Sequence, residues 1–155
     1  MQHVSIDDEA TAESPRRIGL SEPLGTTDFA INRYSLDPGE GFSGVFHTHL
    51  KQEEGFYVVS GTATFEYADK PLAEPETVEI GPDEAIRFAP GEYQSGTNEG
   101  DEPVEALAFG APSDSERPVR VRGPCPDCGE AALRLLFGEN GSGTVCPGCG
   151  AESDI

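Results

Sequence analysis

Between residues 28 and 110 the chain carries only short apolar or alternating runs, each interrupted by turn-forming residues. The runs are Phe29 to Leu36, Phe42 to His49, Phe56 to Val59, Thr62 to Tyr67, Thr77 to Ile80, Ala85 to Phe88 and Val104 to Phe109. Clusters such as Asp37-Pro38-Gly39 and Gly81-Pro82-Asp83 separate them, as expected for tight connections. Strands at this spacing, without a helical period between them, predict an all-β sandwich or barrel.

The composition divides the chain into four segments. Residues 1–19 are acidic with little to bury, and we expect a flexible tail there. Residues 20–112 hold the predicted strands and form the candidate barrel domain. Residues 113–119 are a polar linker, and residues 120–155 form a small separate unit that contains all four cysteines.

The small unit carries two near-identical turns, Cys125-Pro-Asp-Cys128-Gly and Cys146-Pro-Gly-Cys149-Gly. A Cys-x-x-Cys turn lets both sulfur atoms point at one ion, and two such turns supply the four thiolates that Zn²⁺ prefers. With the strand-like segments between the turns, residues 123–150 resemble a zinc ribbon. The resemblance implies a structural zinc with a closed shell, because so short a unit cannot be held together by its own core.

Two disulfides or a redox-active pair are the alternatives to zinc. A reducing compartment disfavours disulfides, and a redox Cys-x-x-Cys needs a βαβ context that the sequence lacks. The unit has three arginines against five acidic residues, so it offers no basic patch for nucleic acid. We therefore expect a structural or protein-contact role.

The segment from Gly41 to Gly61 carries a second candidate metal site. On a β-strand His47 and His49 point to the same face, because side chains repeat every two residues. A carboxylate on the next strand would complete a set of ligands with them. The alternative is a pair of solvent-facing histidines on an edge strand.

The spacing of Gly41, His47, His49, Glu54 and Gly61 resembles the first conserved motif of the cupin superfamily. Glu53 fits a shorter version of the motif, but the residue in the place of the final glycine is then Ser60. The resemblance therefore favours Glu54 as the carboxylate ligand, with Glu53 facing solvent.

The second cupin motif is matched only in part. Gly91 and Asn98 keep its spacing, but the position of the usual fourth ligand, a histidine, holds Gln94. This glutamine could coordinate through its amide oxygen, bond to a metal-bound water, or do neither. The resemblance covers residues 20–112 and implies a small antiparallel double-stranded β-helix, a jelly-roll barrel, with the site in its mouth.

Two functional hypotheses follow from this resemblance. The first is a metal-dependent cupin enzyme, a dioxygenase-like oxygenase or an isomerase, acting on a small organic molecule. If Gln94 does not coordinate, two histidines and one carboxylate resemble the ligand set of non-haem Fe(II) oxygenases. If Gln94 does coordinate, the set suits Fe, Mn, Ni, Co or Zn. The second is a non-enzymatic metal- or ligand-binding cupin whose zinc ribbon contacts a protein partner or a second copy.

Charge excludes some partners. The chain has 29 acidic residues against 10 basic ones and a formal charge of −19, so it has no general attraction for nucleic acid or anionic membranes. No apolar run approaches the roughly 18 residues that span a bilayer, and the N-terminus lacks a signal-like pattern. We expect a cytoplasmic protein. Arg33 and Arg87 are isolated cations on predicted strands, where they either bind a substrate carboxylate or pair with surface acids.

The acidity also resembles that of proteins from extreme halophiles, because acidic residues run along the whole chain and only two lysines are present. In molar salt the Debye length falls to about 3 Å, so like charges at the surface hardly repel each other. The alternative is an ordinary acidic protein. We expect folding to require salt, and full stability without added KCl in a refolding series would contradict this expectation.

Overall fold

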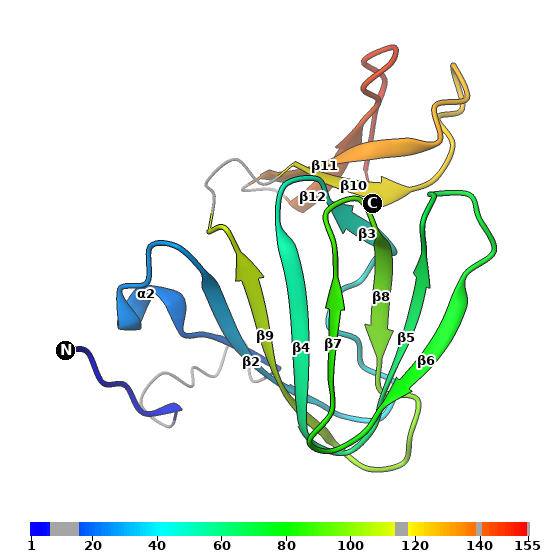
Figure 1. Ribbon diagram of the computed structural model, residues 1–155. Helices are drawn as coiled ribbons and strands as arrows, with labels where there is room; N and C mark the ends of the chain where they lie inside the picture. Colours follow the sequence, from blue (N-terminus) through cyan, green and yellow to red (C-terminus); the bar gives the residue numbers. More distant parts are fainter. Residues whose placement is uncertain (7–15, 114–117, 139–140, 155) are drawn as a thin grey trace.

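The computed structural model describes residues 1–6, 16–113, 118–138 and 141–154, whose strands pair antiparallel throughout (Figure 1). One sheet has the order β1-β2-β9-β4-β7. Its strands are β1 Arg17–Gly19, β2 Ala30–Leu36, β9 Val104–Ala111, β4 Glu53–Ser60 and β7 Ala85–Phe88. The short helix α2, Ser21–Leu24, lies between β1 and β2. The prediction of an all-β chain is confirmed.

The second sheet has the order β13-β12-β11-β10-β3-β8-β5-β6. Its strands are β13 Glu152–Asp154, β12 Gly141–Val145, β11 Ala132–Gly138, β10 Val119–Arg122, β3 His47–His49, β8 Tyr93–Thr97, β5 Ala63–Ala68 and β6 Glu76–Ile80. Strands β3, β8, β5 and β6 face the first sheet across the barrel, and the four C-terminal strands extend beyond it (Figure 1).

The barrel core forms from the inward-facing residues of both sheets. Alternating burial along β9 turns Val104, Ala106 and Ala108 inward, as expected for a strand with one wet face. Phe42 packs against Phe56 and Phe65 with ring centroids 4.8 and 5.4 Å apart. The aromatic side chains thus supply much of the apolar area that stabilises this small barrel.

Strand β8 was not among the strands predicted from the sequence. Its residues Tyr93 to Thr97 include Gln94, Ser95 and Gly96, which give no apolar alternation. At Gly96 a Cβ atom would lie 2.4 Å from the Phe65 ring and 2.7 Å from the Phe42 ring. The glycine is therefore needed so that the core phenylalanines can pack against the strand. Because a glycine stands where an inward apolar side chain would otherwise be, the sequence shows no strand pattern at this position.

The predicted run from Phe42 to His49 is a strand only at its end, where His47–His49 forms β3. Gly41 makes an isolated bridge to Thr97, and a Cβ there would lie 2.9 Å from the Ser43 carbonyl oxygen. Phe42 N–H also donates to the Gly96 carbonyl oxygen at 2.9 Å, so the chain pairs with β8 at Gly41 and Phe42 and again at His47, but residues 43–46 form no strand.

The C-terminal strands continue the barrel sheet through β10. Val119, Arg120 and Val121 pair with His49, Thr48 and His47, and β10 also pairs with β11. Val119 and Val121 are buried, so the sheet is continuous and packed where the two parts meet. Of the predicted linker, residues 114–117 lie outside the described residues.

Part of the segment assigned to the tail is structured. Arg17–Gly19 forms β1 and pairs with Asn32, Arg33 and Tyr34 of β2, which buries Ile18. Residues 7–15 of that segment lie outside the described residues. Within the described parts of the chain, no helix is long and apolar enough to cross a membrane.

Candidate metal centre

Strands from both sheets bring the predicted barrel ligands together. His47 and His49 lie on β3, and Gln94 lies on the neighbouring strand β8, where it pairs with His47. Glu54 lies at the start of β4 in the opposite sheet. Ligand atoms of the two histidines and of Glu54 all lie within 4.8 Å of one another. The centre therefore bridges the two sheets, and its geometry depends on the barrel having closed.

Glu54 lies close to all three other candidate ligands of this cluster. Its Oε2 atom lies 3.4 Å from His49 Nε2 and 3.9 Å from His47 Nε2. Gln94 Nε2 donates a hydrogen bond of 2.8 Å to the same oxygen and lies 3.4 Å from His47 Nε2. In this orientation Gln94 offers its amide nitrogen to Glu54, and only its Oε1 atom has the lone pairs of a metal ligand.

Glu53 points the other way, as expected for neighbouring residues on a strand. It is exposed, and its Oε2 atom lies 2.6 Å from Arg87 Nε on β7. The hydrogen bond from Arg87 lowers the pKa of Glu53. The arrangement places Glu54, and not Glu53, beside the histidines.

The protonation states suit metal binding. Burial lowers the pKa of His47 more than the charge of Glu54 raises it, so the ring is neutral at pH 7. His47 Nδ1 lies 3.0 Å from the Val45 carbonyl oxygen, which can only accept, so Nδ1 carries the proton and Nε2 presents its lone pair. For Glu54, burial raises the pKa, but the hydrogen bond and the charge of His49 and the hydrogen bond from Gln94 lower it overall. Glu54 is therefore a carboxylate.

Two buried polar atoms at the centre have no hydrogen-bond partner among the described residues: His49 Nδ1 and Gln94 Oε1. Buried polar atoms without a partner are costly and call for an explanation such as an ion or a water molecule. Two imidazoles, a carboxylate and an amide form a donor set that suits Fe, Mn, Ni, Co or Zn. The residues present therefore fit a transition metal.

The centre opens onto a cavity of about 600 Å³. Phe42, Phe56 and Ala108 form part of its apolar wall, and Tyr34 lies among them with its ring centroid 5.1 Å from that of Phe42. Burial raises the pKa of Tyr34, so its hydroxyl stays protonated at neutral pH. The cavity has the size and the mixed lining of a small-molecule site.

Several cavity residues were not predicted from the sequence, namely Arg16, Arg17, Asn32 and Tyr34. For the two arginines, the signal in the sequence is the pair Arg16-Arg17 itself, which stands out in a chain with so few basic residues. Arg33 and Arg87, the candidates considered from the sequence, instead pair with Glu105 and Glu53 on the barrel surface.

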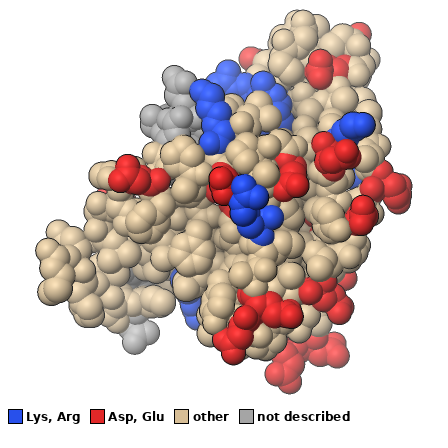
Figure 2. Space-filling model, in the orientation of Figure 1, with Lys and Arg blue, Asp and Glu red and all other residues tan. Residues whose placement is uncertain are grey.

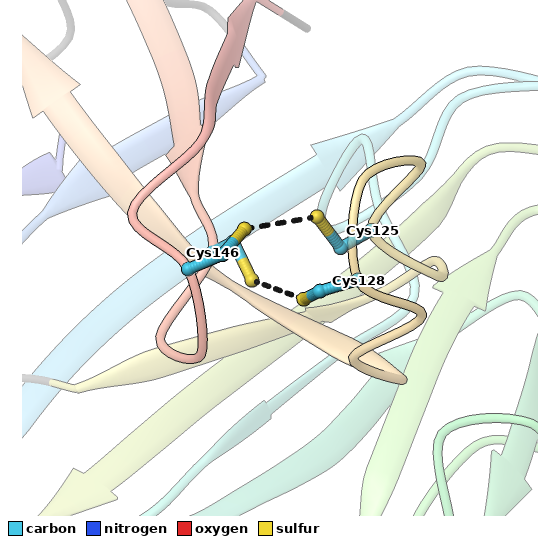
Figure 3. Close-up of side chains that lie close together, drawn as sticks. Cys125, Cys128 and Cys146 are labelled. Carbon is cyan, nitrogen blue, oxygen red and sulfur yellow. Dashed lines mark hydrogen bonds between the residues drawn. The ribbon is translucent and has the colours of Figure 1, made fainter.

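The four cysteines form a second cluster. The side chains of Cys125, Cys128 and Cys146 point toward one another (Figure 3). Cys125 Sγ lies 3.6 Å from Cys149 Sγ, and Cys128 Sγ lies 3.4 Å from Cys146 Sγ. These distances are far from a disulfide bond of about 2.05 Å. A zinc–sulfur bond of about 2.3 Å in a tetrahedron gives sulfur atoms about 3.8 Å apart, close to the observed values.

The thiols differ in acidity. Backbone hydrogen bonds at Cys149 and Gly148 lower the pKa of Cys146 to about 6. At Cys128 the neighbouring sulfur atoms outweigh a backbone hydrogen bond at Glu130 and raise the pKa to about 12. Four thiolates so close together therefore need a cation among them, which is consistent with a zinc ribbon.

Comparison with known proteins agrees with this architecture. A family model described as a cupin domain matches residues 32–110. A sugar phosphate isomerase of the cupin superfamily from Silicibacter pomeroyi is 17% identical with a TM-score of 0.68, over 99% of this chain and 96% of that one. A putative sugar phosphate isomerase from Acidithiobacillus ferrooxidans is 24% identical with a TM-score of 0.60, over 84% and 78%.

A cupin protein from Bacteroides fragilis is 21% identical with a TM-score of 0.59, over 83% of this chain and 93% of that one. No curated protein matches the chain significantly. At these identities the solved structures establish a shared fold, and the expected double-stranded β-helix is confirmed. The family match over the barrel, together with the fold, shows that this chain belongs to the cupin family.

Proposed function

We propose that this cupin is a metal-dependent enzyme that isomerises a small organic molecule. The observation that carries the proposal is the convergence of His47, His49 and Glu54 within 4.8 Å of one another beside a cavity of about 600 Å³. His47, His49 and Glu54 would hold the metal. When bound, it would supply a Lewis acid that polarises an oxygen of the molecule in the cavity.

The choice of isomerisation has two supports. Two of the cupin structures that share this fold are described as sugar phosphate isomerases, one of them as putative. In addition, the protonated Tyr34 hydroxyl lines the cavity and can donate a hydrogen bond to an oxygen of the bound molecule. The apolar wall around Phe42 and Phe56 limits water near that oxygen, which strengthens such polar contacts.

Oxygenase chemistry is the second candidate. Gln94 donates its amide hydrogen to Glu54, so in this orientation the ligand set is two histidines and one carboxylate. That set leaves positions on the metal for both O₂ and substrate. The two candidates differ in whether O₂ is consumed.

Elemental analysis of the purified protein tests the metal centre. We expect zinc in the cysteine unit and a second metal ion in the barrel. His47→Ala and Glu54→Ala should each lose the barrel metal and keep the zinc. Glu53→Ala is the matched control, because it removes a neighbouring carboxylate that faces solvent. Unchanged metal content in His47→Ala and Glu54→Ala would refute the barrel centre.

The reaction is tested on metal-loaded protein with a panel of aldose and ketose phosphates, followed by NMR together with an oxygen electrode. Interconversion of an aldose and a ketose without O₂ uptake supports the isomerase, and Glu54→Ala should abolish it. Consumption of O₂ in proportion to substrate supports the oxygenase instead. A metal-loaded protein that binds small molecules but converts none of them supports a non-enzymatic binding cupin.

A further inference from the structure

Two consecutive arginines line the cavity of a strongly acidic chain. Arg16 and Arg17 are exposed and also line the cavity, so they lie where it opens to solvent. Residues 1–117 contain 24 acidic and 7 basic residues, and Figure 2 shows several separate clusters of acidic groups on one face of the molecule. Among the described lining residues the acidic one is Glu54, which faces the histidines. The opening therefore differs in charge from its surroundings.

The guanidinium of Arg17 is held in place by a neutral group. Its Nε and Nη2 atoms donate hydrogen bonds of 3.1 and 2.9 Å to Asn32 Oδ1. Strand β1 supports this contact, because Gly19 pairs with Asn32 and Arg17 pairs with Tyr34. An amide acceptor fixes the orientation of the group without neutralising its charge, and the remaining N–H donors stay available.

Arginines on the outside of the barrel behave differently. Arg33 pairs with Glu105, and Arg87 pairs with Glu53. Among the described residues no carboxylate lies within 4.0 Å of Arg17. On the inner face Arg17 is thus paired with the neutral Asn32, whereas Arg33 and Arg87 on the outer face are paired with glutamates. The positive charge of Arg17 is therefore left free to act on the cavity.

Tyr34 connects the arginines with the metal centre. The charges of Arg17 and Arg16 act to lower the pKa of its hydroxyl and that of Glu54 acts to raise it, although burial is the main effect. Tyr34 is therefore within electrostatic reach of both the arginines and Glu54. Arg16, Arg17, Tyr34 and Glu54 all line this one cavity.

We propose that the ligand of this cavity carries an oxyanion group, a carboxylate or a phosphate, that is bound by Arg17 with the help of Arg16. Another oxygen of the same molecule faces His47, His49 and Glu54. Guanidinium groups bind both oxyanions through paired charge-assisted hydrogen bonds, which a neutral ligand cannot match. The inference rests on the proposed function, because it assumes that the metal centre and the arginines serve one ligand.

Calorimetric titration of the full metal-loaded chain with glucose 6-phosphate, gluconate and glucose tests the inference. These probes share a carbon skeleton and differ in their terminal group. We expect at least one anionic probe to bind about tenfold more tightly than glucose. The phosphate and the carboxylate arms show which oxyanion is preferred. Equal affinity of both anions and glucose, or no binding of either anion, would overturn the inference.

Variants assign the effect to Arg17. Arg17→Gln should weaken the preferred anionic probe about tenfold and leave glucose unchanged, whereas Arg17→Lys should retain part of the affinity. Arg87→Gln, on the outer face, is the matched control and should have no effect. Asn32→Ala keeps the charge of Arg17 but removes the acceptor that orients its guanidinium, so we expect a smaller loss of affinity for the anion. This variant tests the assignment even if Arg17→Gln folds poorly. An Arg17→Gln variant that binds the anion as tightly as the wild type would contradict the assignment.

Metal content measured on the same samples separates the two proposals. Arg17→Gln should keep the barrel metal, because Arg17 does not touch the ligands. A barrel metal that is present without any preference for an anion overturns the oxyanion inference alone. A wild-type protein without a barrel metal overturns the proposed function as well.

Discussion

The barrel centre and the cysteine centre bring their ligand atoms together in different ways. In the barrel, His47 and His49 come from one sheet and Glu54 from the other, above a core that includes the fully buried Phe65 and Val58. In the C-terminal unit, two turns supply four thiols in a segment of under 40 residues. A fold can position the first site without a metal, whereas we expect the second unit to need a metal in order to fold.

The two regions meet at the strand that carries both histidines. Strand β3 makes one residue pair with β8, His47 with Gln94, but three with β10 of the C-terminal unit. Two backbone hydrogen bonds extend this pairing at its two ends. Leu50 N–H donates to the Pro118 carbonyl oxygen at 3.1 Å, and Arg122 N–H donates to the Phe46 carbonyl oxygen at 3.0 Å. A change in the C-terminal unit should therefore reach the barrel ligands through the backbone.

The largest expected effect comes from removing the buried thiols of the cysteine centre. Cys125→Ser with Cys146→Ser should release the zinc and unfold residues 118–154, because structural zinc supplies on the order of 10 kcal/mol to such units. Elemental analysis and hydrogen exchange of β10 to β13 measure this. Asp127→Ala changes an exposed residue between two cysteines and serves as the control. Retained protection of β11 and β12 in the double variant would show that the unit folds without zinc.

The barrel should be sensitive to overpacking instead. Gly96→Ala places a Cβ atom 2.4 Å from the Phe65 ring, so we expect a loss of about 3 kcal/mol in the free energy of unfolding. Urea denaturation monitored by aromatic circular dichroism measures it. Gly44→Ala is the matched control, since no atom lies within 4 Å of the added Cβ. A loss equal to that of the control would mean that β8 is less tightly packed than described.

The coupling between the regions is expected to have a smaller effect. In the Cys125→Ser, Cys146→Ser variant β3 loses its larger partner, and the barrel should bind metal about tenfold more weakly, as when supporting partners of ligands are removed. Competition with a chelator of known affinity, using the wild type and Asp127→Ala for comparison, measures this. Unchanged affinity would mean that β8 alone positions the histidines.

The most local change is at Gln94. Gln94→His places an imidazole opposite His47, and an additional nitrogen ligand should tighten barrel metal binding by up to about tenfold. Gln94→Ala should weaken binding by a smaller factor, because Glu54 then loses a hydrogen bond of 2.8 Å. The same chelator competition compares them. If Gln94→Ala weakens binding as strongly as His49→Ala does, then Gln94 acts as a ligand in its own right.

Much of this protein is determined by local sequence. Alternating runs such as Ala30 to Leu36 give strands because the period of two matches a sheet with one buried face. The spacing of His47 and His49, and the two Cys-x-x-Cys turns, place ligand atoms together within a few residues of one another. Such features need no knowledge of distant segments, which is why the sequence predicts these pairs of ligands, whereas Glu54 reaches the histidines only when the two sheets close into the barrel.

The tertiary structure alone decided three other features. Strand β8 forms because Gly96 lets Phe65 and Phe42 pack against it, although its own residues carry no strand pattern. Strand β10 joins β3 across some 70 residues of chain, and Arg17 reaches the cavity only because β1 pairs with β2. These contacts depend on the register between distant strands, which is fixed by barrel closure and core packing and not by any local pattern.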